Sequence, residues 1–225
     1  IQRGKMFSRY FEDAQKQLLK VYVKAPKKDA LEAPKGKKSV KKDFGPLISF
    51  MNSASSPEIE FVQRKIIDQS GYVSESSDFA ACRKIYTGMD EIFNESVPAE
   101  IVSGTFHTID EVNRKQLHDC LVRAALSKKT DYFAESESEP LFIPAFIIAF
   151  KSTYTIRELK MAIMEIYDQD SVDPIFEVDI MMVLGQGLII RNWREGARNY
   201  IALETGADTL KWFFLLMNEY LENKG

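Results

Sequence analysis

Residues Phe142–Phe150 have the sequence FIPAFIIAF, and this short stretch decides the fold. Consecutive apolar residues are typical of a strand that is covered on both faces in the middle of a sheet. A helix is predicted next, over Thr155–Tyr167, because Thr155 and Glu158 form the T-x-x-E pattern of a capping box. The apolar segment Val178–Leu184 (VDIMMVL) predicts a second buried strand. A strand, a helix and a strand in this order form a parallel crossover, so we expect an α/β fold with a mixed sheet flanked by helices.

Hydrophobic periodicity extends this pattern in both directions along the chain. Helices are predicted at 5–23, 57–69, 78–95, 110–127 and 208–221, and strands at 100–108, 130–134, 188–191 and 200–203. Residues 1–77 are therefore expected to form N-terminal helices with a lysine-rich mobile loop at about 25–42. Residues 78–225 are expected to form the α/β core.

The composition excludes several classes of protein. Of the 225 residues, 45 % are hydrophobic and 28 % are charged, which is ordinary for a soluble globular protein. The two cysteines, Cys82 and Cys120, are too few for a disulfide scaffold and are expected to be buried thiols. No stretch comes near the roughly 20 apolar residues that a membrane-spanning helix needs. No signal peptide is recognisable, so a cytoplasmic protein is expected.

Charge is distributed unevenly. The net charge is −3, but residues 20–42 hold nine lysines and two acids, which is +7 and leaves −10 for the rest. The segment 25–42 is either a solvated linker or an arm that attracts phosphate groups. In the second case, contacts with DNA are expected from Lys35, Lys37, Lys38, Lys41, Lys42 and, further along the chain, Lys129.

Most familiar catalytic motifs are absent. The sequence has no P-loop, no G-x-G-x-x-G and no G-x-S-x-G. Gly185-Gln186-Gly187 follows a predicted strand and is expected to be a hairpin turn. His107 and His118 lack the spacing of a zinc site and are expected to be structural. Carboxylates and lysines therefore remain as the candidate catalytic side chains.

Lys151 comes directly after the long apolar strand. It shares a face with Ala149, because side chains two positions apart on a strand point the same way. Ile148 and Phe150 are expected to face the core on the opposite side. Either the strand simply ends here and the lysine reaches into water, or the lysine belongs to a functional site. Asp131, at the start of another predicted strand, is the candidate acid for such a site.

These segments resemble the core of the PD-(D/E)XK nucleases, the restriction-endonuclease-like superfamily. Its pattern is an Asp on one strand and Glu-x-Lys on the next, followed by a helix. The resemblance implies that Asp131 and a glutamate hold Mg²⁺ or Mn²⁺ against the scissile phosphate, while Lys151 orients the attacking water. In this sequence the glutamate position is Ala149, whose methyl group cannot bind a metal ion. The alanine is either the natural residue or a change made to silence the enzyme.

Within that superfamily, residues 79–223 are similar to the NucC-like endonucleases of bacterial and phage defence. The similarity rests on Ile92–Pro98 (IFNESVP), Thr130–Phe133 (TDYF) and Ile147–Thr153 (IIAFKST). It implies a restriction-endonuclease-like core, a metal-dependent DNA endonuclease of anti-phage defence, a homo-oligomer and a cyclic-nucleotide activator. It also implies a helix-borne metal ligand, for which Glu91 or Asp90 is the candidate. The predicted helix 110–127, between the first two strands, has no counterpart in that group.

Two other functions fit the same sequence. The chain could be a catalytically dead nuclease-fold module, with Ala149 as its natural residue, that binds nucleic acid or a protein partner. It could also be an unrelated α/β interaction protein whose last helix packs in an oligomer interface, since Trp212, Phe213 and Phe214 cover more than one helix face. Both nuclease-fold hypotheses require Asp131 and Lys151 to approach within about 4–6 Å.

Asp179 is an acid within the buried strand VDIMMVL. It is expected either to pair with Lys151 or Arg191, or to mark a solvated strand end.

Overall fold

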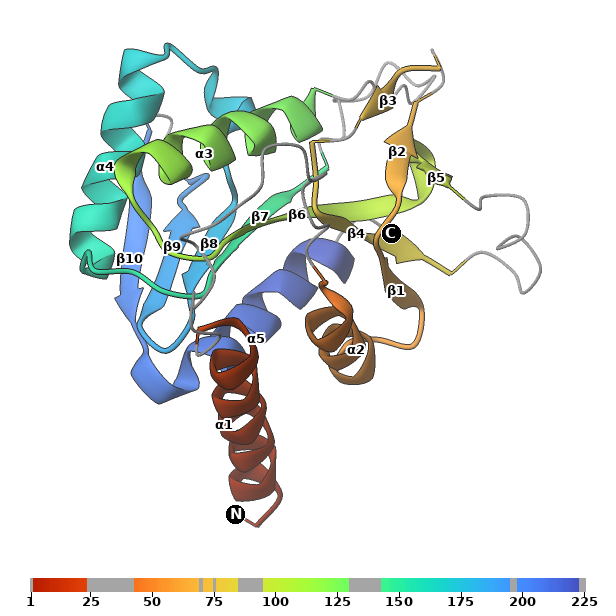
Figure 1. Cartoon of the computed structure of the whole chain (residues 1–225), viewed down its shortest axis with the longest axis vertical. Coiled ribbons are helices and arrows are strands. Elements are labelled where there is room, and N and C mark those ends of the chain that lie inside the picture. The colour runs from red at the N-terminus through yellow and green to blue at the C-terminus, as the bar shows by residue number, and fades with distance from the viewer. Residues whose placement is uncertain are drawn as a thin grey trace, which may run out of the picture.

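The computed structural model describes residues 2–23, 43–68, 71–74, 76–84, 95–129, 143–194 and 198–222. A seven-stranded sheet crosses the molecule in the order β1-β4-β6-β7-β8-β9-β10 (Figure 1). Its strands are β1 (Ile59–Val62), β4 (Phe79–Arg83), β6 (Val102–Ile109), β7 (Ala145–Ala149), β8 (Ile180–Val183), β9 (Gly187–Arg191) and β10 (Tyr200–Glu204). A smaller sheet has the order β3-β2-β5, with β2 (Lys65–Ile67), β3 (Val73–Ser74) and β5 (Ser96–Pro98).

The large sheet is mixed. Its central pairs, β6–β7 and β7–β8, are parallel. The pairs on either side, β1–β4, β4–β6, β8–β9 and β9–β10, are antiparallel. Helix α3 (Arg114–Lys128) comes between β6 and β7, and α4 (Ile156–Gln169) comes between β7 and β8. The predicted parallel crossover and the mixed α/β sheet are confirmed.

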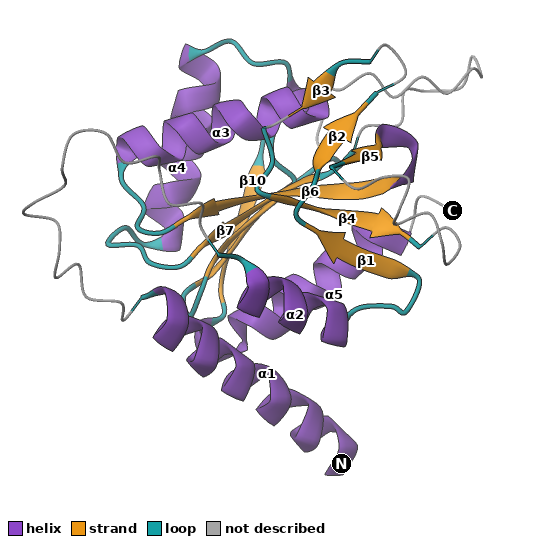
Figure 2. Ribbon diagram, turned by 45° about the vertical axis from the view of Figure 1, so that its right-hand side comes forward, coloured by secondary structure: helices purple, strands orange, loops and turns teal. Residues whose placement is uncertain are grey.

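Helices cover both faces of this sheet (Figure 2). One face packs against α1 (Gln2–Tyr22), α2 (Gly45–Ala54) and α5 (Thr209–Glu222). The other face packs against α3 and α4. The core is therefore two apolar layers separated by the sheet, as the burial of continuous hydrophobic strands requires.

Strand β7 contributes side chains to both apolar layers. Phe146 and Ile148 point into the layer with α1, α2 and α5, while Ile147 and Ala149 point into the layer with α3 and α4. All of these side chains are buried. Helix α4 then begins at the predicted capping box, in which Thr155 Oγ1 accepts a hydrogen bond from the Glu158 N–H at 3.2 Å.

Two predicted helices are wrong. The segment 57–69 forms β1 and β2, and the beginning of 78–95 forms β4, while residues 85–94 lie outside the described part of the chain. The apolar positions of 57–69 fit a helical period, but the side chains of β1 alternate between buried and half-buried, as they do in a strand. These segments form strands because they pair with strands that are distant in sequence, and local hydrophobic periodicity contains no information about such pairing.

The other elements agree more closely with the sequence patterns. The predicted strands 100–108, 188–191 and 200–203 correspond to β6, β9 and β10, and the predicted helices 110–127 and 208–221 correspond to α3 and α5. Helix α2 has no predicted counterpart, and the predicted strand 130–134 lies outside the described residues. The division into 1–77 and 78–225 stays a prediction, although β1 and β4 pair across it. In the described residues, no helix combines the length and apolar character needed to cross a membrane.

Gly187, the first residue of β9, should tolerate no side chain. A Cβ atom there would lie 2.1 Å from the carbonyl oxygen of Leu203 on β10, which is backbone and cannot turn aside. We expect Gly187→Ala to lower the free energy of unfolding by about 3 kcal/mol. In Gly104→Ala the new methyl would meet side-chain atoms of Phe146 and Leu221, which can shift, so the loss should be smaller. Urea unfolding checks both values, and equal stabilities would contradict the packing described.

Candidate functional site

Two adjoining hollows lie where β6 and β7 end. The first has a volume of about 750 Å³ and is lined by residues that precede β4, by the end of β6, by α3 and by residues at the start of β2, including Asp78 and Arg123. The second has a volume of about 630 Å³ and includes Lys151. Asp110 and Gln116 line both. The carboxyl ends of parallel strands in an α/β sheet are the usual place for a ligand site, so these hollows are the candidate site.

Asp78 is one of the acids that line the first hollow. It stands just before β4, where its N–H donates to the Phe106 carbonyl at 2.8 Å. Its Oδ2 accepts hydrogen bonds from Thr108, from the N–H at 2.6 Å and from Oγ1 at 2.9 Å. Its Oδ1 lies 3.2 Å from Nη1 of Arg123 on α3. Both oxygens of the carboxylate are thus engaged by protein donors.

His107 lies beneath this acid, fully buried on the α3 side of β6. Its Nε2 is 3.2 Å from Ser127 Oγ. Burial, and then the positive charge of Arg123, lower the pKa of His107 to about 3, against the opposite influence of Asp78. The ring is therefore neutral at physiological pH, which fits the structural role predicted for it.

The potential nucleophiles near this hollow are inert. Ser127 is fully buried, and its Oγ donates to the Ala124 carbonyl at 2.7 Å. Cys82 and Cys120 are buried free thiols, as predicted, and burial raises the pKa of each to about 12. A neutral, buried thiol or hydroxyl is a poor nucleophile.

Lys151 lines the second hollow, half exposed. Its Nζ lies 3.2 Å from Oε1 of Glu111. The Lys151 ammonium is therefore both in contact with water and ion-paired with the Glu111 carboxylate. Asp110 and Gln116, which also line the first hollow, line the second hollow together with Lys151.

Ala149 does not point into either hollow. It is fully buried in the layer between the sheet and helices α3 and α4, and it is paired with Ile109 on β6 and Val183 on β8. The Ala149 side chain is covered by α3 and α4 and lines neither hollow, whereas Lys151, two residues further on, lines the second. Ile148 and Phe150 face the opposite core layer, as expected.

Several predicted site residues lie outside the described part of the chain. They are Asp131, Glu91 and the lysines Lys35, Lys37, Lys38, Lys41 and Lys42. The approach of Asp131 to Lys151 is therefore not tested. Lys129 is described: it is exposed at the end of α3, with its Nζ 5.2 Å from the centre of the Phe176 ring.

The resemblance implies a metal ion, which needs several donor atoms gathered at one place. Among the described residues, no three His, Cys, Asp or Glu side chains gather into a group that could hold a metal ion. Ala149 offers no donor atom, and the oxygens of Asp78 are held by Thr108 and Arg123. The described residues do not fit a Mg²⁺ site, which takes carboxylate oxygens.

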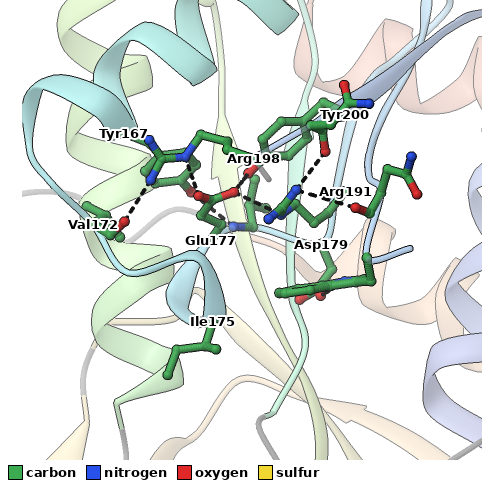
Figure 3. A network of polar contacts seen from close by, with 12 residues as sticks. Tyr167, Val172, Ile175, Glu177, Asp179, Arg191, Arg198 and Tyr200 are labelled. Carbon is green, nitrogen blue, oxygen red and sulfur yellow. Dashed lines mark hydrogen bonds and ion pairs between the residues drawn. The ribbon is translucent and has the colours of Figure 1, made fainter. Parts of the chain in front are cut away.

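A network of buried charges occupies the other end of the sheet (Figure 3). Glu177 is fully buried and pairs with Arg191, at 2.9 Å, and with Arg198, and it accepts a hydrogen bond from the Tyr200 hydroxyl at 2.8 Å. The Asp179 carboxylate pairs with the buried Lys128 at 2.7 Å, and the Asp179 carbonyl accepts a hydrogen bond from the Arg191 N–H at 2.8 Å. Lys151 instead pairs with Glu111.

Asp179 also accepts hydrogen bonds from the Ala145 N–H and from the Trp193 ring nitrogen. Asp168, at the exposed rim, pairs with Arg198. Three acids and three bases thus balance, and a balanced, hydrogen-bonded network of this kind serves the structure rather than a ligand.

Asp78 and Arg123 are the residues that the sequence patterns missed. The predicted helix 78–95 would place Asp78 at a solvated helix end. The available signal was a polar Ser77-Asp78 pair before the apolar FAAC run, which is also how an antiparallel strand begins. Their proximity arises from pairing between β4 and β6, which only the tertiary structure shows.

No family model matches the chain, and no curated protein matches it. Three solved structures are similar over nearly the whole chain. NucC of P. aeruginosa ATCC27853 in its cAAA-bound form has a TM-score of 0.68 at 16 % identity, with 97 % of this chain and 91 % of that chain covered. NucC of E. coli MS115-1 in its apo form has a TM-score of 0.68 at 17 % identity, covering 99 % and 92 %. Its cAAA-bound form has 0.67 at 18 %, covering 97 % and 90 %. The chain therefore has the NucC fold, which confirms the predicted restriction-endonuclease-like core.

Acidification should weaken the fold partly through His107. The folded protein keeps this ring neutral down to a pKa of about 3, whereas the unfolded chain binds the proton near the ordinary value of 6.5. The stabilisation is complete above pH 6.5 and is lost as the pH falls toward 3.

Urea unfolding at pH 7 and at about pH 4 gives the loss in free energy of unfolding on acidification. We expect this loss to be smaller for His107→Gln than for the unmodified chain. His118→Gln, at an exposed position that pairs with Asp170 on the surface, is the control. Identical pH dependence in the His107 variant and the unmodified chain would contradict the buried neutral ring.

Proposed function

We propose that this chain is a nuclease-fold protein that binds nucleic acid and, because alanine stands at position 149, does not hydrolyse it. The observation that carries the absence of hydrolysis is the burial of Ala149, which leaves the expected metal ligand without a donor atom or access to a hollow. The binding rests on the likeness in fold to NucC, on the charge of the lysine-rich segment, and on the described residues that flank this segment and line the two hollows.

The ends of the lysine-rich segment meet at the candidate site. Tyr22 and Val23, the last described residues before it, line the second hollow, and Phe44, just after it, lines the first. The Tyr22 hydroxyl donates to the Asp43 carbonyl at 3.3 Å, so the two ends are held together. The Tyr22 ring stacks on Phe150, with 4.2 Å between ring centres. The described residues on both sides of the lysine-rich segment therefore line the two hollows.

Residues 24–42 carry eight lysines and two acids, a charge of +6. A positive charge of this size attracts the phosphate backbone without reading sequence. We assign DNA contacts to Lys35, Lys37, Lys38, Lys41 and Lys42, with Lys129 as a further contact. Binding of this kind needs no metal ion, which agrees with the donor set around Asp78.

A second candidate is an active, metal-dependent endonuclease of anti-phage defence under the control of a cyclic nucleotide. Two of the similar NucC structures are described as cAAA-bound, which favours an activator of that class. This candidate needs Asp131, with Glu91 as a further ligand, to supply the carboxylates for Mg²⁺ or Mn²⁺ that the described residues do not gather.

Neutralising lysines in the segment should weaken DNA binding in a salt-dependent way. Lys41→Gln with Lys42→Gln removes two charges that lie close in sequence to Phe44, which lines the first hollow. We expect the slope of log affinity against log salt to fall by about two, because each phosphate contact contributes about one. Fluorescence anisotropy with a labelled duplex measures this. Lys16→Gln with Lys115→Gln, two exposed positions elsewhere, removes the same charge and should leave the slope unchanged. Equal effects of the two pairs would refute a specific role for the segment.

Introducing a carboxylate at position 149 should lower the free energy of unfolding and should not produce DNA cleavage. Ala149→Glu would place a charged side chain in an apolar layer, at an expected cost of about 3 kcal/mol in unfolding free energy. Thr153→Glu, at an exposed position lining the second hollow, is the matched control and should be tolerated. Thermal unfolding and plasmid nicking with Mg²⁺ are measured together. A stable Ala149→Glu variant that cuts DNA would favour the second candidate instead.

A further inference from the structure

The second hollow combines aromatic rings with side-chain amides. Tyr22 and Tyr154 line it, together with Asn113 and Gln116 at the start of α3. The Tyr154 side chain is among the exposed large apolar ones, at 38 %. The volume of about 630 Å³ lies within the range of about 300–1,000 Å³ that is usual for small-molecule sites. Aromatic faces and amides are the groups that hold an unstacked nucleobase, by stacking and by hydrogen bonds to its edge.

Hydrogen bonds fix the backbone that carries Tyr154. Its N–H donates to Ser152 Oγ at 2.9 Å, and this hydroxyl donates to the Tyr154 carbonyl at 3.1 Å. The Ser152 carbonyl accepts a hydrogen bond from Gln186 Nε2 at 2.8 Å, and the Lys151 carbonyl accepts one from the Val112 N–H at 2.8 Å. The loop after β7 is therefore ordered, and a ligand that stacks on this ring loses little affinity to the ordering of the loop.

The two amides face the hollow with hydrogen-bonding groups to spare. Asn113 Oδ1 accepts a hydrogen bond from the Gln116 N–H at 2.9 Å, which fixes this side chain as the N-cap of α3. Within the described part of the chain, neither Asn113 Nδ2 nor the side-chain amide of Gln116 has a protein partner. An amide both donates and accepts, so these groups can satisfy the edge of any base.

The charge of the lining favours a base over a phosphate group. The hollow is lined by Asp110 and Glu111 on the negative side and by Lys151 on the positive side, a net charge of −1. The Lys151 ammonium is already paired with Glu111. A phosphate would bring a further negative charge beside two carboxylates, whereas a base is neutral and carries N–H groups that a carboxylate accepts.

We infer that the second hollow takes one unpaired base of a bound nucleic acid, stacked on Tyr154 with its edge toward Asn113 and Gln116. This inference rests on the proposed function, and adds that the chain contacts single-stranded nucleic acid differently from a duplex. A base inside a duplex is stacked and paired, so it must leave the helix before it can enter a hollow. The phosphates of the same strand stay outside, where the lysine-rich segment attracts them.

Fluorescence anisotropy of the full chain tests this assignment with a labelled single strand, the same strand with abasic analogues in place of its nucleotides, and the duplex. Tyr154→Ala should lower the affinity for the single strand about fivefold or more, which is the loss of one stacking contact. It should leave the affinities for the abasic strand and the duplex unchanged, because these offer no unpaired base. Tyr154→Phe keeps the ring and should keep most of the affinity. Tyr72→Ala removes an exposed tyrosine that lines neither hollow, and is the control.

The outcomes separate this inference from the proposed function. Equal affinities of Tyr154→Ala and the unmodified chain for the single strand, while the duplex is still bound, overturn this inference alone. Failure of the unmodified chain to bind any of the three probes overturns it together with the proposed function. Displacement of the labelled strand by a micromolar deoxynucleoside monophosphate would assign the hollow to a free nucleotide, and would also overturn the inference.

Discussion

The burial of β7 on both faces is the constraint on which the rest of the structure depends. A strand whose two faces are both apolar must lie between two layers, so α3 and α4 pack on one side and α1, α2 and α5 on the other. Its parallel neighbours β6 and β8 require crossover helices, and the carboxyl ends of the strands then open into the two hollows. The same constraint explains Ala149. At that position the chain needs a small apolar side chain, whatever chemistry the neighbouring Lys151 performs.

The charged residues of the described chain are used mainly to hold the structure together. Asp78 is held by Thr108 and Arg123 at one end of the sheet, and Glu177 is held by two arginines and a tyrosine at the other. Helix α3 contributes to both groups, through Arg123 and Lys128. Paired, hydrogen-bonded carboxylates have few lone pairs left for a metal ion, and a shared fold does not by itself establish a shared activity.

The centre of the fold, around β7, α4 and β8, could be predicted from the sequence, whereas the region of β1, β2 and β4 could not. The segments of β7, α4, β8 and α5 are long, strongly apolar or clearly capped, so their patterns have one physical solution. The segments of β1, β2 and β4 are short, and apolar residues at 59, 62, 66 and 67 fit a helix as well as strands. Antiparallel pairing of β4 with β6 brings Asp78 beside Thr108, and α3 places Arg123 next to it. No local pattern reports these contacts. Lys151 was identified as a residue of the candidate site because it ends the most predictable strand, whereas the burial of Ala149 depends on helices far away in sequence.

The central claim is that a chain with the NucC fold does not cut DNA when alanine stands at position 149. Incubation of supercoiled plasmid with the unmodified chain measures this most directly, with Mg²⁺ or Mn²⁺ and with or without cAAA. The account predicts no nicked or linear product beyond that seen with the metal ion removed by a chelator. Metal-dependent appearance of either product, in the presence or absence of cAAA, would contradict it.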